Sequence, residues 1–323
     1  MAAVRRDGEL SEWFRILAGV RQGCCLSPDL FNLVLETIMR LALSDEEGGL
    51  KLCGQLVNNL RFADDINLMS EEKINLQLIT DRVNQESQRL GLKINVDKTK
   101  AMAVGKGKEN LKITVESKEV EQVSEFVYLG GLVTEDGTCK ADIKRRIGLT
   151  HVAFNKLQKI WNNKNLSQDI KQGVYNTLVV PVLLYGSECW TLRKQEERSL
   201  LVAEMSWIRR ILGISRLQKL RNEEIRKRFS AEETIVSKIK QRRLRWFGHV
   251  SRMPSHRLPY LALHTRVEGT RSQGRQKARW RDDITNDLKD QGIGMAEAAA
   301  LVNNRDAWRE ICSALSSLAD GRD

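Results

Sequence analysis

Residues 56–69 of the chain read LVNNLRFADDINLM. Two apolar runs, 56–62 and 66–69, flank the short segment Ala63-Asp64-Asp65, and this pattern predicts two strands joined by a tight turn. The turn would hold two adjacent carboxylates. Mg²⁺ prefers such oxygen ligands and usually takes one or two carboxylates together with substrate phosphates. An isolated pair of this kind is also typical of a plain solvated turn, so a metal role needs support from other motifs.

A glycine-rich loop lies upstream, where residues 19–28 read GVRQGCCLSP. Its glycines allow the backbone to approach a ligand closely, and Gln22 between them offers a hydrogen-bond donor and an acceptor. Ser27 before Pro28 predicts a helix whose free amides are capped by the serine, or face a phosphate. Apolar residues over 30–39 give this helix a wide apolar face. An ordinary loop before a helix is the alternative interpretation.

The remainder of the first 137 residues predicts short strands and one further helix. Asp7-Gly8 is typical of a hairpin turn. Ser70-Glu71-Glu72 predicts the start of a helix that ends at Gly91, with Ile74 and Val83 on its apolar face. Further strands are predicted at 92–95 and 101–104, a β pair at 112–115 with 126–129, and a turn at 136–137.

After Gly137 the spacing of apolar residues changes from two to about three and a half, which indicates helices. The first helix covers 143–161, the second starts near Ser167 and bends or ends near Pro181, and the third covers about 195–212 with Gly213 after it. The sequence therefore predicts an α+β first part and a mostly helical remainder.

The charge of the chain is unevenly distributed. The total is 53 basic and 42 acidic residues, a net charge of +11. Residues 1–137 carry a net charge of −5, residues 138–323 carry +16, and residues 216–281 alone carry +14. A basic half of this size indicates a polyanionic partner, with nucleic acid as the default. A solvated charged face on long helices is the alternative.

The sequence disfavours membrane-spanning, secreted and zinc-binding proteins. A bilayer span needs about 20 apolar residues, whereas the longest apolar candidate, 177–185, is short and contains Pro181. The first residues are charged and mixed, unlike a secretion signal. The six cysteines have no CxxC spacing and make no metal-like pair with the four histidines. We therefore expect reduced thiols and no structural zinc site.

Four motifs occur in order over residues 19–130: Gly-x-x-Gln-Gly-x-x-x-Ser-Pro at 19–28, Phe-Ala-Asp-Asp at 62–65, Gly-Leu-Lys-Ile-Asn-Val-Asp-Lys-Thr at 91–99, and Tyr-Leu-Gly at 128–130. Each motif is weak alone, but together and in this order they resemble the palm of reverse transcriptases. The form is similar to that of non-LTR (LINE-type) retrotransposons.

This resemblance implies a fold and an activity. Residues 1–137 would be a partial right-hand polymerase palm, α+β with an antiparallel sheet and helices, and would include a primer-grip hairpin. Residues 138–215 would be a helical thumb, and residues 216–323 a basic helical region that binds nucleic acid. The implied reaction is RNA-directed DNA synthesis with Mg²⁺, or Mn²⁺ as the alternative ion. The partners would be an RNA template, a DNA primer and deoxynucleoside triphosphates. The implied location is nuclear, or cytoplasmic within a ribonucleoprotein.

The resemblance also assigns roles to residues. Asp64 and Asp65 would be the metal ligands, with Asp64 the surer of the two. Ala63 would leave room for the primer end. Lys98 would approach the leaving pyrophosphate, with a surface lysine as the equal alternative. Gln22, Gly23 and Phe62 would lie beside the template and the incoming nucleotide, although a core position is favoured for Phe62. The primer grip would consist of Tyr128, Leu129 and Gly130.

One departure from the family concerns the first residues. The family carries another catalytic aspartate on a strand upstream of the Gln-Gly motif, but Asp7 lies in a turn with Gly8 and no apolar strand leads into it. A truncated palm is therefore expected, with incomplete two-metal geometry and poor catalysis by this chain alone. A catalytically inactive, nucleic-acid-binding relic or recruited fragment is the alternative. A metal-dependent nuclease is less favoured, because no histidine or further acidic cluster supports Asp64 and Asp65.

Two segments, 238–254 and 274–284, are dense in arginine and contain tryptophan. Interleaved arginines and aromatics can bind phosphates and stack on bases. However, Trp280 and Ile284 follow a spacing of four, which favours a core role for the apolar residues and a binding role for the arginines. Asp282-Asp283 is predicted to be solvated. The predicted contacts to the nucleic-acid backbone are Arg242, Arg243, Arg245, Arg275, Lys277 and Arg279.

Overall fold

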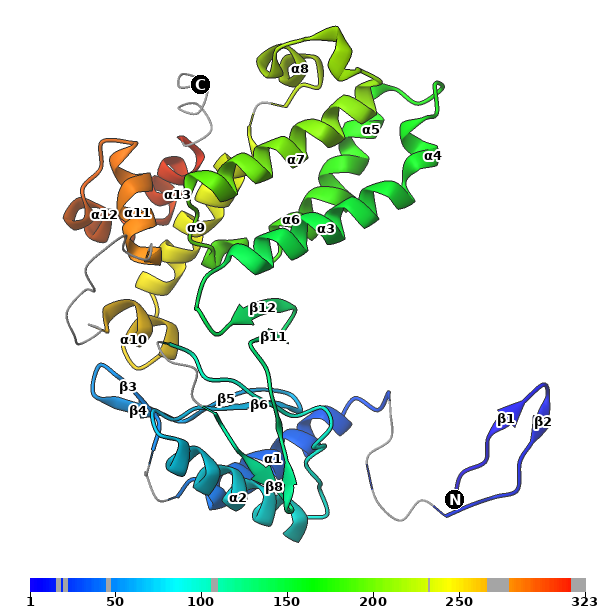
Figure 1. The fold of residues 1–323 in the computed structure, drawn as a ribbon, viewed down its shortest axis with the longest axis vertical. Coiled ribbons are helices and arrows are strands. Elements are labelled where there is room, and N and C mark those ends of the chain that lie inside the picture. Colours follow the sequence, from blue (N-terminus) through cyan, green and yellow to red (C-terminus); the bar gives the residue numbers. More distant parts are fainter. Residues whose placement is uncertain are drawn as a thin grey trace. The chain divides into compact units, whose positions relative to one another are not determined.

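The computed structural model describes residues 1–15, 19, 23–44, 48–105, 110–231, 233–265 and 279–314. The chain forms two compact units (Figure 1). The first unit comprises Met1–Ala101 and Asn110–Gln122, and the second comprises Met102–Glu109 and Val123–Asp323. The fold class is α+β, as predicted. The assignment to palm, thumb and tail, with boundaries after residues 137 and 215, stays a prediction.

The first unit contains all the described helices and strands up to residue 122. Its helices are α1 (Ser27–Ala42) and α2 (Lys73–Arg89). Its strands are β1 (Arg5–Arg6), β2 (Glu9–Leu10), β3 (Leu50–Leu52), β4 (Gln55–Val57), β5 (Asn59–Phe62), β6 (Asp65–Leu68), β7 (Lys100–Ala101), β8 (Thr114–Val115), β9 (Lys118–Glu119) and β10 (Glu121–Gln122).

The core of the first unit lies between α1 and α2. Leu35 and Met39 of α1 pack with Ile79 and Val83 of α2, and the β6 side chain Ile66 packs against the same cluster. This burial of apolar surface is what holds β6 on the two helices. Consequently the hairpin that carries the adjacent carboxylates is packed against the two helices through β6.

Two helix details differ from the prediction. Ser27 is the first residue of α1 and does not cap it: Leu26 occupies the cap position, without a side-chain hydrogen bond to the helix. The Ser27 hydroxyl hydrogen-bonds the Cys24 thiol instead. In α2, Val83 is buried as predicted, but Ile74 is exposed because the buried stripe runs through Ile79.

The strand predictions are partly wrong. Among the described residues, strands occur only as two-stranded pairs rather than one larger sheet, and the β7–β10 pair is parallel. Residues 92–95 form no strand. Residues 112–115 do not pair with 126–129, because Glu116 and Ser117 adopt left-handed backbone angles (φ 50° and 65°) and fold β8 directly back onto β9. Both hairpins predicted around Asp7-Gly8 and Ala63-Asp64-Asp65 are confirmed.

The second unit begins with one hairpin and continues as helices. Its strands are β11 (Glu125–Tyr128) and β12 (Gly131–Thr134). Its α-helices are α3 (Lys140–Lys156), α4 (Gln158–Trp161), α5 (Gln168–Val174), α6 (Val180–Leu184), α7 (Lys194–Leu212), α8 (Asn222–Arg228), α9 (Ile235–Ser251), α10 (Leu258–His264), α11 (Trp280–Lys289), α12 (Met295–Leu301) and α13 (Arg305–Ala314).

The helix signals after Gly137 are confirmed, except that the single helix predicted over 143–161 is divided at Leu157 into α3 and α4. Ser167 caps α5 by accepting a hydrogen bond from the backbone N–H of Ile170, and Gly213 ends α7 with a left-handed φ of 67°. Pro181 lacks the N–H that would bond to the carbonyl of Thr177, so the chain between α5 and α6 forms a π-helical turn over Tyr175–Val179. The predicted bend near Pro181 is therefore a local widening of the helix.

Two apolar clusters hold the second unit together. One lies among α3 to α9 and includes the stacked rings of Phe154 and Trp161, whose centroids are 5.0 Å apart. The other lies among α9, α11, α12 and α13 and includes Ile284 and Trp308. Because α9 contributes to both clusters, it is the element that joins the last helices to the earlier ones.

Candidate functional site

The adjacent carboxylates lie at the tip of the β5–β6 hairpin. Phe62 pairs with Asp65, so Ala63 and Asp64 are the two residues of the turn. Ala63 has a left-handed backbone (φ 51°), and both aspartates are exposed to solvent. This arrangement leaves the two carboxylates accessible to a cation and its ligands.

The hairpin is tied to α1 by an ion-pair network. Nη1 of Arg61 on β5 lies 2.8 Å from Oε2 of Glu36, and Nε of Arg40 lies 2.7 Å from Oε1 of the same carboxylate. Hydrogen bonds from Arg40 and, with a smaller effect, from Arg61 lower the pKa of the Glu36 carboxyl group. These contacts fix the strand that leads into the turn, while the apolar layer fixes the strand that leaves it.

The other residues assigned to template and nucleotide lie in the first unit or outside the described residues. Gln22 lies outside the described residues. Gly23 is exposed with a left-handed φ of 83°. The interpretation of Phe62 as a core residue is wrong: its side chain is 64 % exposed, because it stands at the hairpin tip beyond the layer of the two helices.

Lys98 lies in an exposed turn that follows Asn95. The side-chain oxygen of Asn95 accepts a hydrogen bond from the backbone N–H of Lys98 at 3.1 Å, and this contact shapes the turn at residues 96–98. The lysine is therefore accessible to a charged ligand, and its proposed role stays a prediction.

The donor set at the hairpin suits a hard divalent cation only in part. Within the described ranges, no three histidine, cysteine, aspartate or glutamate side chains are grouped so that they could hold a metal ion. The pair Asp64 and Asp65 offers the one or two carboxylates that Mg²⁺ usually takes when phosphate oxygens supply further ligands.

The Tyr128-Leu129-Gly130 motif forms the turn of the β11–β12 hairpin, in the second unit. Leu129 and Gly130 both have left-handed backbones (φ 47° and 79°), and Tyr128 pairs with Gly131. Sequence reasoning missed the residues that hold this turn, Asp142, Arg146 and Tyr185, which are distant in the sequence. The only local signal was the i, i+4 pair of opposite charges at 142 and 146.

The arginines of α9 divide into buried and exposed residues. Arg242 and Arg245 are exposed, whereas the prediction that Arg243 lies on a binding surface is wrong, since its side chain is 2 % exposed. Arg243 forms ion pairs with Asp283 (2.9 Å) and Asp287 (2.7 Å) on α11. The predicted solvation of Asp283 is wrong for the same reason. Arg279 is exposed before α11, and Arg275 and Lys277 lie outside the described residues.

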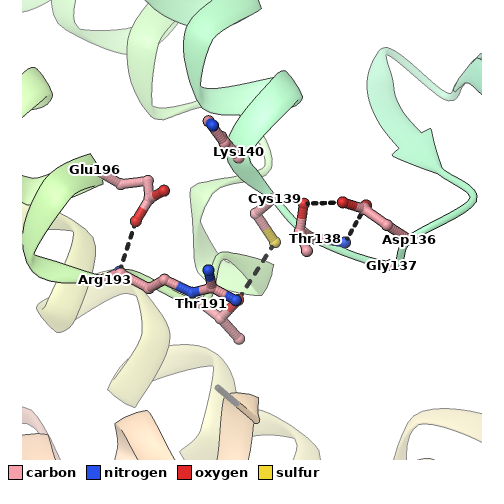
Figure 2. Close-up of a pocket in the computed structure, with 8 residues that line it drawn as sticks. All are labelled: Asp136, Gly137, Thr138, Cys139, Lys140, Thr191, Arg193 and Glu196. Atoms are coloured by element: carbon pink, nitrogen blue, oxygen red, sulfur yellow. Dashed lines mark hydrogen bonds between the residues drawn. The ribbon is translucent and has the colours of Figure 1, made fainter. Parts of the chain in front are cut away.

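A cavity of about 220 Å³ lies where α3 and α7 begin, and Figure 2 shows the side chains around it. Glu196 accepts the backbone N–H of Arg193 at 3.1 Å, and Asp136 accepts the N–H and hydroxyl of Thr138. The Thr191 hydroxyl donates to the Cys139 sulfur at 3.8 Å. Since these polar groups already serve the turn and the two helix starts, we assign the cavity no ligand.

No disulfide links the six cysteines, all of which lie in the described part of the chain. Burial raises the pKa of Cys189 and of Cys312 to about 11 in each case. In the part of the chain that the structure describes, no helix has the length and apolar character needed to cross a bilayer.

Comparison with known proteins shows that the first part of the chain, which runs from the first unit into the β11–β12 hairpin, is similar to one enzyme family. Residues 2–132 match the family "Reverse transcriptase (RNA-dependent DNA polymerase)". A putative uncharacterized transposon-derived protein of Caenorhabditis elegans is 27 % identical over 281 residues, which cover 84 % of this chain and 95 % of that protein. The Pol polyprotein of the type-2 retrotransposable element R2DM of Drosophila melanogaster is 34 % identical over 153 residues. The R2 polyprotein of Nasonia vitripennis is 32 % identical over 142 residues.

These matches differ in how much of the relative they span. The aligned parts cover 44 % and 41 % of this chain but only 14 % of either Pol polyprotein. The similarity to the retrotransposon polyproteins therefore concerns one region of each of them.

Proposed function

Because residues 2–132 match the reverse transcriptase family and the chain is similar to non-LTR retrotransposon proteins, we propose that the first unit is the polymerase region of an RNA-directed DNA polymerase. The reaction would add deoxynucleotides to a DNA primer on an RNA template. The observation that carries the proposal is the exposed Asp64-Asp65 pair at the tip of the β5–β6 hairpin, inside the matched region.

Asp64 and Asp65 would hold Mg²⁺, or Mn²⁺ in its place, together with the phosphates of the incoming nucleotide. The bound ion would neutralise charge on the transferred phosphoryl group. Ala63, whose side chain is a single methyl group, leaves space beside the carboxylates for the primer end. The exposed Phe62 supports contact with template or nucleotide, together with Gln22 and Gly23.

A second candidate function, nucleic-acid binding without efficient synthesis, is favoured by one observation. Within the described ranges no third carboxylate joins Asp64 and Asp65 in a metal-holding group, whereas a two-metal transfer clamps both the attacking and the leaving oxygen. We therefore propose that the 323-residue chain by itself binds template–primer but extends it weakly. The exposed Arg242, Arg245 and Arg279 would contact phosphates. We also propose that the protein is nuclear, or cytoplasmic within a ribonucleoprotein.

Primer extension on an RNA template with Mg²⁺ tests the polymerase proposal. Extension by the wild-type chain is expected to be weak, and Asp64→Asn is expected to reduce it at least about 100-fold, because the variant loses the charge that holds the ion. Asp7→Asn is the matched control, because Asp7 also lies in an exposed hairpin turn with a left-handed φ of 52°. Equal extension by Asp64→Asn and the wild type would contradict the assigned site.

Binding at several salt concentrations tests the proposed phosphate contacts. Affinity for an RNA–DNA hybrid is expected to fall as salt rises, and the double variant Arg242→Ala/Arg245→Ala should reduce the slope of log K against log salt by about 2, one for each phosphate that is no longer neutralised. Arg305→Ala/Arg309→Ala removes the same charge from α13 and should leave the slope nearly unchanged. A slope that is the same in both double variants would refute the assignment to α9.

A further inference from the structure

The backbone carbonyl groups in the turn of the β11–β12 hairpin are bound by side chains of α3 and by Tyr185, the residue that follows α6. The Tyr185 hydroxyl donates to the Leu129 carbonyl at 2.8 Å, and Nη1 of Arg145 donates to the Gly130 carbonyl at 3.1 Å. Nη2 of Arg146 donates to the same Gly130 carbonyl. Both carbonyl groups at the tip of the hairpin are thus bound to the helices.

These contacts form one connected group. The guanidinium of Arg146 lies over the ring of Tyr185, 4.4 Å from its centroid. Asp142 lies beside the arginine, accepts the backbone N–H of Leu132 at 3.1 Å and accepts the indole N–H of Trp190 at 2.8 Å. Asp142 and Arg146 are almost fully buried. Burial of charged groups is costly unless they are paired, so these contacts favour the observed arrangement of Asp142 and Arg146.

The ring of Tyr185 packs closely against Gly130. A Cβ added to Gly130 would lie 3.1 Å from Cε1 of Tyr185, and the residue has a left-handed φ of 79°. The ring of Tyr185, itself 51 % exposed, therefore lies directly against the turn at this point. The side chain of Leu129, by contrast, remains 41 % exposed. The backbone of the turn is thus bound by side chains of the second unit, whereas the apolar side chain of Leu129 is exposed to solvent.

We propose that Tyr185 and Arg146 are positioning residues that clamp the Leu129–Gly130 turn and thereby set where the turn meets the 3′ end of a primer. The clamp is a property of the second unit alone. Its consequence rests on the proposed function, because only a template–primer gives the hairpin an end to contact. A hairpin turn fixed by backbone hydrogen bonds keeps one geometry, and a fixed geometry is what end-specific binding requires.

Two measurements on the full chain test this proposal, with Tyr185→Phe as the main variant. This change removes only the hydroxyl and keeps the ring under Arg146, so folding should be preserved. Hydrogen exchange of the peptide that covers residues 126–134 should become about fivefold faster, as expected for the loss of one hydrogen bond. Tyr260→Phe, in α10, is the matched control and should not change this exchange. Unchanged exchange in Tyr185→Phe would overturn the clamp, whatever the chain binds.

The second measurement compares affinity for an RNA–DNA hybrid with a recessed primer 3′ end and for a blunt hybrid. The wild type is expected to prefer the recessed end, and Tyr185→Phe and Arg146→Lys should each lower this preference at least about threefold while leaving affinity for the blunt hybrid unchanged. A merely structural role would weaken both affinities equally. Full preference in both variants would overturn the positioning role and leave the proposed function intact. A wild type without any preference would refute the primer-grip assignment itself.

Discussion

Replacing Arg243 with alanine is expected to lower the free energy of unfolding of the second unit by about 3–5 kcal/mol, the usual result when one partner of a buried ion pair is removed. The side chain is 2 % exposed, and its Nε and Nη2 both contact Oδ2 of Asp287, at 2.8 and 2.7 Å. Its Nη1 contacts Asp283 and the carbonyl of Trp190, each at 2.9 Å. Without the arginine, two buried or nearly buried carboxylates lose their main partner.

The pH dependence of this loss follows from the pKa of Asp287. Burial raises that pKa, and Arg243 is the largest influence that opposes the rise. In Arg243→Ala the pKa should rise further, so the folded variant binds a proton at a pH where the unfolded chain has released it. The destabilisation should therefore be greatest near neutral pH and should shrink as the pH falls toward the ordinary pKa of an aspartate.

Urea denaturation at neutral and acidic pH measures both effects. Arg245→Ala is the control, because Arg245 lies two residues further along the same helix and is exposed. It should change the unfolding free energy by less than about 0.5 kcal/mol. If Arg243→Ala were as stable as Arg245→Ala, the ion pairs with α11 would have no energetic importance and α11 would have to be held by its apolar contacts alone.

Arg243 also illustrates what the sequence could and could not predict. The buried stripe of α9 runs through Ile239, Leu244 and Phe247, and position 243 lies four residues from both 239 and 247. Helical spacing alone would therefore have placed this arginine on the core side. Its partners could not be predicted, because Asp283 and Asp287 are about 40 residues away and look like solvated acidic residues in isolation.

The strands were harder to predict than the helices for a physical reason. Helix bounds depend on local signals such as the Ser167 cap and the left-handed Gly213, and these were predicted correctly. Strand pairing depends on the geometry of turns. The left-handed residues at 116 and 117 are not glycines, so nothing in the residue types announced the β8–β9 hairpin.

The candidate site shows the same division. The Asp64-Asp65 turn is built from adjacent residues and was predicted from them. The clamp on the Leu129–Gly130 turn joins residues 129 and 130 to 146 and 185, and such contacts are set by the packing of helices rather than by local sequence. The exposure of a side chain likewise depends on the fold and not on the residue type alone. Phe62 is apolar, yet it is exposed because it stands at the tip of a hairpin.

Replacing Gly248 with alanine is expected to displace α13 from α9 and to cost about 3 kcal/mol of stability, at the upper end of the usual penalty for overpacking. A Cβ at this position would lie 2.1 Å from Nε1 of Trp308 and 2.6 Å from its Cδ1. The indole cannot move aside easily, because it is 3 % exposed and donates to the carbonyl of Leu244 at 3.1 Å. Glycine is therefore required here for the close approach of a ring to a helix backbone.

Gly148→Ala is the matched control for this prediction. Gly148 also lies inside a long helix, α3, but nothing lies within 4 Å of an added Cβ. Alanine should stabilise that helix by up to about 1 kcal/mol, the difference in helix propensity. The two variants thus make the same chemical change with opposite expected signs, which urea denaturation followed by tryptophan fluorescence can distinguish. Equal stability of both variants would contradict the packing of Trp308 on α9. The double variant Gly248→Ala/Trp308→Leu should be less destabilised than the sum of its single changes, because the smaller side chain removes the clash.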